Sequence, residues 1–159
     1  MSIEKVREYL KPFGKDSDIR EFTESSATVE LAAHAVGVIP ARIAKSLSFL
    51  TREGPIVIVV AGDARIDNKK YKSLFGEKAK MLTPEEALKF TGHAVGGICP
   101  FALPENVRVY LDISLKRFTT VFPACGSANS AIELTCDELH TISHAVDWID
   151  IASFRNPTL

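Results

Sequence analysis

The spacing of apolar residues changes along the chain, and the two spacings predict a mixture of helices and strands. In the segment around residues 29–36, Val29, Ala32, Ala33 and Val36 recur three or four positions apart, as one buried helical face requires. The helices predicted in this way cover residues 2–11, 29–36, 68–75, 83–90 and 136–140.

Residues that favour helix ends mark two of these segments most clearly. Thr83, Pro84 and Glu86 form the sequence pattern of a capping box, with proline at the first helical position. For the segment 29–36, either Ser26 or Thr28 can cap the start, and Gly37 ends the helix. Both helices are therefore expected to begin and end sharply.

Short runs of β-branched and aromatic residues predict the strands. The predicted strands cover residues 46–50, 56–61, 107–112, 118–122, 131–135 and 146–151. The first two are separated by the turn-like sequence TREGP and are read as a hairpin. We expect residues 1–159 to form a single mixed α/β domain, mostly strands with helices packed outside, because no linker or repeat interrupts the pattern.

Composition narrows the class of protein. Of the 159 residues, 46% are apolar and 25% charged, and no apolar run reaches the ~18 residues that a membrane span needs. The net charge of −1 gives no general attraction to nucleic acid, and neither a DNA nor a membrane partner is expected. Three cysteines without a CxxC pair suit a reducing compartment, so a cytoplasmic protein is expected.

Lys45 is the first residue that suggests chemistry. In a strand that begins near residue 45, side chains alternate, so Lys45 shares a face with Leu47 and Phe49, opposite Ser46 and Ser48. A lysine aimed along an apolar face either extends its ammonium to solvent at the strand end or sits in a pocket. The spacing leaves both interpretations open.

The second candidate is the loop sequence GGICP at residues 96–100. It lacks the spacing of a P-loop and of a dinucleotide-binding motif. Adjacent glycines offer unobstructed backbone N–H groups that can hold an anion or a developing oxyanion, and a tight turn is the alternative. A further polar turn, residues 123–130, brings Gly126, Ser127 and Asn129 between two strands.

Other reactive side chains lack the partners that their chemistry needs. His140 and His144 have metal-ligand spacing, but the glutamate of an HExxH motif is missing, so no metal or cofactor is expected. Ser127 is not in a GxSxG motif, and Cys99 has no identifiable histidine partner, which favours a buried structural thiol.

Basic residues gather between residues 65 and 80, where six lysines and arginines face two acids. This segment could contact a phosphate backbone, although a solvated helix face explains it equally well. The candidate contacts are Arg65, Lys69, Lys70 and Lys72.

Taken in order, four segments resemble the YbaK/EbsC family, also called the prolyl-tRNA synthetase editing-domain family. The segments are TVELAAHAVGVIPARIAKSLSF, VVAGDARIDNKKYK, LTPEEALKFTGHAVGGICPF and VFPACGSANSAIEL, within residues 20–152. The resemblance implies a strongly curved, barrel-like mixed sheet of about seven strands with helices outside. It also implies a free-standing aminoacyl-tRNA deacylase that removes a small, wrongly attached amino acid (alanine, serine, threonine or cysteine) from tRNA(Pro) or a related tRNA.

The same resemblance implies roles for individual residues. The family lysine falls on Lys45, which would hold the terminal adenosine phosphate or the substrate carbonyl. The family loop falls on residues 96–100, so the amides of Gly96 and Gly97 would face the ester. The remaining substrate contacts would come from Thr28, Pro100, Gly126, Ser127 and Asn129. The small side chains of Ala124 and Cys125 would form walls of the pocket for the amino acid.

The expected partners are the acceptor end of an aminoacyl-tRNA, bound through the basic segment, and an aminoacyl-tRNA synthetase that assists binding. Two other hypotheses remain from the residues alone. One is a binding module of the same fold that senses an aminoacyl group or a nucleotide without catalysis. The other is a metal-dependent hydrolase that uses His140 and His144.

Overall fold

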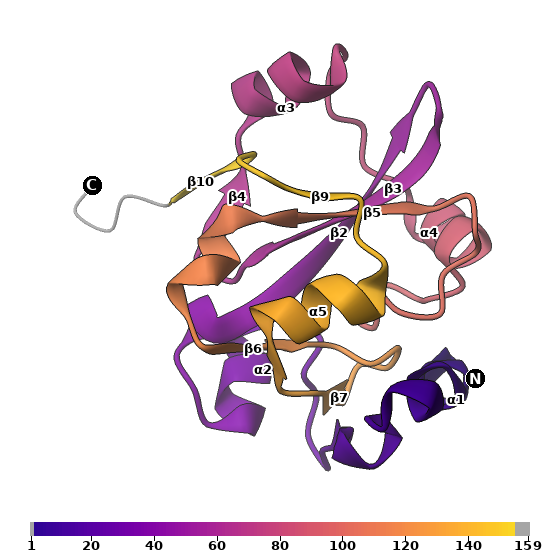
Figure 1. The fold of residues 1–159 in the computed structure, drawn as a ribbon, viewed down its shortest axis with the longest axis vertical. Helices are drawn as coiled ribbons and strands as arrows, with labels where there is room; N and C mark the ends of the chain where they lie inside the picture. The colour runs from indigo at the N-terminus through magenta and orange to yellow at the C-terminus, as the bar shows by residue number, and fades with distance from the viewer. Residues whose placement is uncertain (1, 155–159) are drawn as a thin grey trace.

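The protein is built around a curled mixed sheet of six strands, seen in a computed structural model that describes residues 2–154 (Figure 1). The strand order is β8-β6-β2-β3-β5-β9, and two small sheets pair β1 with β7 and β10 with β4. The strands are β1 Arg20–Glu21, β2 Ile43–Thr51, β3 Gly54–Ala61, β4 Ala64–Ile66, β5 Arg108–Asp112, β6 Thr120–Pro123, β7 Ser130–Ala131, β8 Leu134–Thr135, β9 Asp147–Ile149 and β10 Ala152–Phe154.

The mixed α/β architecture predicted from the sequence is confirmed. The main sheet has six strands, one fewer than the family resemblance implied, and the remaining strands lie in the two small sheets. The predicted hairpin is present and longer than predicted, since β2 and β3 pair antiparallel from Ala44 opposite Ala61 to Thr51 opposite Gly54. This hairpin occupies the centre of the sheet, where it meets strands on both sides.

Two predicted strands differ from the observed ones, since one is divided in two and the other is shorter than predicted. Residues 131–135 form β7 and β8, because the Ile132 N–H donates to the Pro123 carbonyl and takes the chain out of a single ladder. Of the predicted strand 146–151, only residues 147–149 form β9, and the chain then turns into β10 where the Asp112 carboxylate accepts the N–H groups of Ile151 and Ala152. Side-chain and long-range hydrogen bonds of this kind leave no mark on the local apolar pattern.

The five α-helices within the described residues match the predicted ones closely. They are α1 Ser2–Leu10, α2 Val29–Val36, α3 Asn68–Phe75, α4 Pro84–Thr91 and α5 Cys136–Ser143. The capping box of Thr83 and Glu86 is present, and Thr28 caps α2 by accepting the Leu31 N–H. Gly37 ends α2 in a left-handed conformation with φ 85°. Within residues 2–154, no helix is long and apolar enough to span a membrane.

The core lies on both faces of the central strand β3, whose residues Ile56–Ala61 are fully buried. On one face, α3 packs Tyr71 against Phe49 of β2, with ring centroids 5.3 Å apart. Val6 of α1 and Leu139 of α5 belong to the same buried cluster. Because β3 is held between two neighbours and two packed faces, β2 beside it is fixed in register and can position side chains accurately.

Candidate functional site

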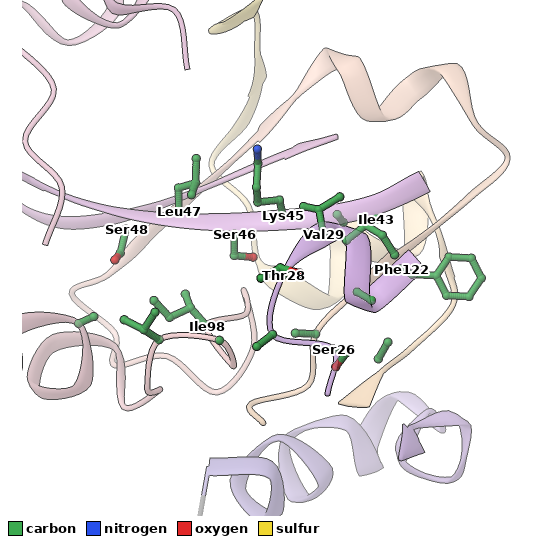
Figure 2. A pocket seen from close by; sticks show the side chains of 18 of the residues that line it. Ser26, Thr28, Val29, Ile43, Lys45, Ser46, Leu47, Ser48, Ile98 and Phe122 are labelled. Atoms are coloured by element: carbon green, nitrogen blue, oxygen red, sulfur yellow. The ribbon is translucent and has the colours of Figure 1, made fainter. Parts of the chain in front are cut away.

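A cavity of about 270 Å³ lies along the edge of β2 that faces away from β3 (Figure 2). On this edge β6 pairs only with Ile43 and Ala44, and the next backbone bonds are at Ser48 and Leu50, which pair with Leu82 and Lys80. The stretch 45–47 therefore lies in a gap between two paired segments. The cavity fills that gap, and α2, α4 and the loop 94–98 contribute its walls.

Lys45 is the one charged residue among the described residues that line this cavity. Its side chain and that of Leu47 extend to one side of β2, while Ser46 and Ser48 extend to the other (Figure 2). The Lys45 ammonium donates to the Ala64 carbonyl at 2.8 Å. It also helps to lower the pKa of Asp63, whose main stabilising contact is a hydrogen bond from Arg117. Lys45 therefore lines the cavity from β2, while its ammonium extends to the Ala64 carbonyl on the side of the strand opposite Ser46, Ser48 and Ile98 (Figure 2).

The backbone of Ser46 also faces the cavity. Two backbone hydrogen bonds show which residues of β2 point their N–H and C=O groups to this edge. The Leu50 N–H donates to the Lys80 carbonyl at 2.8 Å, and the Ser48 carbonyl accepts from the Leu82 N–H at 3.0 Å. In an antiparallel strand the groups of every second residue point to the same edge, so the N–H and C=O of Ser46 point into the gap. The cavity thus has a polar backbone wall as well as side chains.

Two hydroxyls at the cavity have no hydrogen-bond partner within residues 2–154. They belong to Ser26 and Ser46, and both oxygen atoms are shielded from solvent by the protein. Ser26 is held in place because its own N–H donates to the Ala128 carbonyl at 2.6 Å. A buried hydroxyl without a partner is unfavourable, and the Tyr71 hydroxyl, away from the cavity, is in the same position.

Sequence reasoning did not assign these two serines to the site. Ser46 was placed opposite Lys45, and Ser26 was considered only as a helix cap. The sequence could not reveal that β6 stops pairing at Ala44, which is what opens the edge beside Ser46. Ser48 and Ser130, also unpredicted, line the cavity as well.

The two loop glycines have different surroundings. Gly96 lines the cavity with φ 95°, and a methyl group there would contact Ala27 at 3.3 Å. Gly97 is not among the lining residues, and its N–H donates to the Ala94 carbonyl at 2.9 Å. A Cβ at Gly97 would approach the backbone of Gly126 to 2.8 Å. Close packing against that backbone is what requires glycine at this position.

Behind the loop, His93 connects several backbone and side-chain groups. Its Nε2 donates to the Phe101 carbonyl at 2.8 Å, so Nδ1 accepts from the Ser2 hydroxyl of α1. The His93 N–H in turn donates to the Thr91 hydroxyl. His93 is 1% exposed, and burial lowers its pKa. This histidine thus joins the two ends of the loop and ties them to α1.

Cys99 lies beside this histidine, with Sγ 3.5 Å from His93 Nε2. Complete burial raises the pKa of the thiol to about 12. A thiol with so high a pKa remains protonated at neutral pH and is a poor nucleophile. The structural reading of Cys99 is the one that fits these surroundings.

The predicted substrate contacts divide into two groups. Thr28 lines the cavity, and Ala124 does so from β6's end. The predicted residues outside the lining are Pro100, Cys125, Gly126, Ser127 and Asn129. Ser127 and Asn129 form the polar turn behind it, where the Ser127 hydroxyl lies 2.7 Å from that of Ser130 and the Asn129 amide donates to Phe22. Ser127 and Asn129 therefore lie behind Ser130, which lines the cavity itself.

The predicted tRNA-binding residues lie apart from the cavity lining. Arg65 is in β4, and the three lysines are in α3. Lys70 is engaged by the Asp150 carboxylate and the Ala152 carbonyl, both at 2.9 Å. The basic segment nevertheless reaches the cavity at its C-terminal end, where Lys80 pairs with the edge of β2. A long ligand could therefore contact both regions.

The histidine pair proposed as a metal site has other contacts. The His140 ring stacks on Trp148, with centroids 6.0 Å apart and planes at 19°. Throughout residues 2–154, no three His, Cys, Asp or Glu side chains are grouped so that they could hold a metal ion. His144 ends α5 with a left-handed φ of 54°. His140 thus packs against a tryptophan, and His144 forms the end of a helix.

Comparison with known families and proteins finds similarity to one domain family. The family model described as "Aminoacyl-tRNA editing domain" matches residues 23–142. The protein YwhH of Bacillus subtilis (strain 168) is 55% identical over 95% of this chain and 97% of its own length. A proline–tRNA ligase of Thermotoga neapolitana is 36% identical over 59% of this chain, which is 16% of the ligase.

Two further relatives carry names that refer to editing. The "Putative Cys-tRNA(Pro)/Cys-tRNA(Cys) deacylase EbsC" of Enterococcus faecalis is 25% identical over 77% of this chain and 76% of its own length. A crystal structure described as "a putative trans-editing enzyme for prolyl tRNA synthetase" superposes with a TM-score of 0.87 and 31% identity. That superposition covers 96% of this chain and 97% of the other.

Proposed function

The chain belongs to the aminoacyl-tRNA editing domain family, and we propose that it is a deacylase that acts in trans on mischarged tRNA. Its substrate is the ester between a small amino acid and the terminal ribose of tRNA(Pro) or a related tRNA. The names of its relatives support an editing role. The residues that perform it are those at the open edge of β2.

The observation that carries this proposal is the cavity between the β2 edge and the loop 94–98. Its volume of about 270 Å³ lies just below the ~300 Å³ at which pockets for drug-sized ligands begin, so it suits a small acyl group. Its lining residues are mostly apolar and include one lysine and several serines. Such a lining can hold the apolar part of a small aminoacyl group and orient its polar ester.

Hydrolysis of an aminoacyl ester needs no nucleophile from the protein, because the ester is already activated. A water oxygen attacks the carbonyl carbon, the bond to the ribose oxygen breaks, and the ribose hydroxyl leaves with a proton. The protein has to position the ester and stabilise the charge that develops on the carbonyl oxygen. A vicinal ribose hydroxyl of the tRNA can take part by orienting the water.

Lys45 and Gly96 are the groups best placed for these tasks. The Lys45 ammonium lies at the cavity edge on the Ala64 carbonyl, and a substrate phosphate or carbonyl would compete for it. Of the two predicted loop amides, that of Gly97 is engaged by Ala94, which leaves Gly96 as the candidate oxyanion donor. Gly97 would act by holding the loop against the turn at Gly126.

Binding of the rest of the tRNA is proposed to use the basic segment around α3, with a synthetase partner assisting. Exchanging Lys69 and Lys72 for glutamate should weaken tRNA binding and make it less sensitive to salt. Exchanging Lys116, which lies over the Trp148 ring at 4.6 Å, is the matched control. Equal binding by the α3 variant and the control would reject α3 as a tRNA contact.

The experiment that tests the function is deacylation of a panel of tRNA(Pro) samples charged with alanine, serine, threonine, cysteine or proline. We expect repeated release of at least one small amino acid per protein molecule, with proline retained. Stoichiometric retention of aminoacyl-tRNA without release would instead indicate the binding module. Loss of release after treatment with a chelator would favour the metal-dependent hydrolase.

A further inference from the structure

The turn between β3 and β4 receives the end of the Lys45 side chain, so the groups that hold this turn also bear on the lysine. The Lys45 ammonium donates to the Ala64 carbonyl at 2.8 Å. The residue before Ala64 is Asp63, which carries a carboxylate. An ammonium group binds a carboxylate more strongly than it binds a neutral carbonyl. The surroundings of Asp63 explain why the ammonium of Lys45 is found on the carbonyl.

Arg117 binds both carboxylate oxygens of Asp63. Its Nη1 donates to Oδ2 at 3.0 Å and its Nη2 donates to Oδ1 at 2.6 Å, a bidentate geometry that arginine can form and lysine cannot. The hydrogen bond from Arg117 is the main cause of the lowered pKa of Asp63, and the charge of Lys45 adds a smaller contribution. Lys45 therefore lies near a carboxylate that a second cation already neutralises.

The guanidinium group of Arg117 is itself held by several neighbours. Its Nε donates to the Ser114 carbonyl at 2.8 Å, and its Cζ lies 4.9 Å from the ring centroid of Phe118 and 4.5 Å from that of Phe154. Ser114 and Arg117 belong to one short 3-10 helix, which is joined to β3 because the Ser114 hydroxyl accepts the Ala61 N–H at 3.0 Å. Stacking and hydrogen bonding together thus orient the guanidinium toward Asp63.

The backbone of the turn is packed closely as well. A Cβ at Gly62 would lie 2.1 Å from the Pro40 carbonyl oxygen and 2.7 Å from Val29 Cγ1. Pro40 lies in the segment that leads into β2, and Val29 lies in α2 and lines the cavity. These contacts keep the turn, and with it the Ala64 carbonyl, beside the start of β2.

We propose that Arg117 is a positioning residue: it occupies the carboxylate of Asp63, so that Lys45 stays on a neutral acceptor and can transfer to an anionic group of the tRNA. The proposal rests on the proposed function, in which Lys45 meets the substrate, and adds Arg117 and Asp63 to it. A phosphate readily replaces a carbonyl as the partner of an ammonium, whereas a carboxylate competes with it. Without Arg117, the carboxylate of Asp63 would attract Lys45 and withdraw it from the substrate.

The experiment measures steady-state deacylation of mischarged tRNA by Arg117→Gln, by Asp63→Asn and by the double variant. In Arg117→Gln kcat/KM should fall by about fivefold, mainly through a higher KM, since a partly exposed ion pair is worth up to about that factor. Asp63→Asn and the double variant should both stay within about twofold of the native value, because the competing carboxylate is gone. The double variant is therefore expected to be more active than Arg117→Gln.

Arg108→Gln is the matched control, because Arg108 also pairs with an exposed carboxylate, that of Glu53 at 3.0 Å, and neither residue lines the cavity. It should keep the native kcat/KM. Rescue by Asp63→Asn separates positioning from a structural role, since a loss of packing around Arg117 would persist in the double variant. A double variant no more active than Arg117→Gln, or native activity in Arg117→Gln, would overturn the proposal while leaving the deacylase function in place.

If the native protein hydrolyses none of the mischarged tRNAs, the proposed function fails and the position of Lys45 decides the inference. The readout is then a crystal structure of Arg117→Gln without tRNA. A Lys45 ammonium within hydrogen-bond distance of the Asp63 carboxylate would support competition between the two cations for Asp63. An ammonium that remains on the Ala64 carbonyl and makes no contact with Asp63 would overturn the proposal.

Discussion

Buried polar groups occur at the base of the loop 93–100 and at the cavity, and the two sets differ in whether their hydrogen bonds are complete. Behind the loop, His93 is joined to Ser2, Thr91 and Phe101, and each ring nitrogen has a partner. In front of it, the cavity hydroxyls of Ser26 and Ser46 have none within residues 2–154.

The difference separates polar groups that hold the loop from hydroxyls that add no hydrogen bond to the fold within residues 2–154. A satisfied buried cluster stabilises the loop that it connects, and removing one member leaves the others unpaired. An unsatisfied hydroxyl costs stability in the absence of a ligand, and such a cost persists where a site needs it. Mutations on the two sides of the loop should therefore have opposite consequences for stability and activity.

The largest effect on stability is expected at Gly97, where the loop packs on the turn behind it. In Gly97→Ala the new methyl group would lie 2.8 Å from backbone atoms of Gly126 and Ser127. Neither backbone can move without displacing a wall of the cavity, so the free energy of unfolding should fall by about 3 kcal/mol. Chemical denaturation measures the change.

Gly14→Ala is the control for this variant. Gly14 has φ 70° but no atom within 4 Å of its would-be Cβ, so only backbone strain of about 1 kcal/mol is expected. Equal losses in the two variants would show that packing against Gly126 is unimportant.

A smaller loss is expected when the satisfied cluster is opened. His93→Ala removes the contacts to Ser2 and Phe101 and should lower the free energy of unfolding by about 2 kcal/mol. Deacylation should weaken mainly through KM, because the loop carrying Gly96 loses its attachment. A variant with native stability would contradict the role assigned to this histidine.

The pH dependence of stability provides a milder test of the same cluster. Burial lowers the pKa of His93 below its ordinary value of 6.5, so the unfolded chain takes up the proton more readily. Its stabilising contribution is complete above pH 6.5 and is lost as the pH falls below that value. The midpoint of thermal unfolding should therefore drop from pH 7 to pH 5, and less steeply in His93→Gln. Identical slopes would assign the pH dependence to other groups.

The smallest effect on stability is expected on the cavity side. In Ser26→Ala and Ser46→Ala a hydroxyl without a partner is replaced by hydrogen, so unfolding should change by less than ~0.5 kcal/mol or become slightly harder. Thermal unfolding of the ligand-free protein measures this. A clear loss of stability would mean that these hydroxyls hold the fold, and the contrast between the two clusters would disappear.

Local signals in the sequence were sufficient for most of the helices and for the central hairpin. Thr83, Pro84 and Glu86 act within one helical turn, and Thr28 caps the helix that it precedes. The strands β2 and β3 pair across a short turn, so their apolar pattern alone defines them. The orientation of Lys45 on β2 also follows from simple alternation (Figure 2).

The site depended on contacts between distant segments, which the sequence pattern does not encode. The cavity exists because β6 leaves β2 after Ala44, and this single pairing decides that Ser46 faces a ligand space. The GGICP loop was recognised, but the close approach of Gly126 to Gly97 could not be. For this reason the sequence predicts the same role for Gly96 and Gly97, whereas in the structure only Gly96 lines the cavity.

If the edge of β2 is the editing site, single-turnover deacylation of mischarged tRNA should depend on Lys45, which Lys45→Met tests. This substitution keeps the apolar stem and removes the ammonium that lies on Ala64. Its rate is compared with those of the native protein and Lys116→Met at 37 °C or below, after each variant is shown to be folded. We expect a rate at least about 100-fold lower for Lys45→Met, with Lys116→Met unaffected, because a charged group at the reacting ester is lost. A native rate for Lys45→Met would contradict it and would place the chemistry elsewhere in the fold.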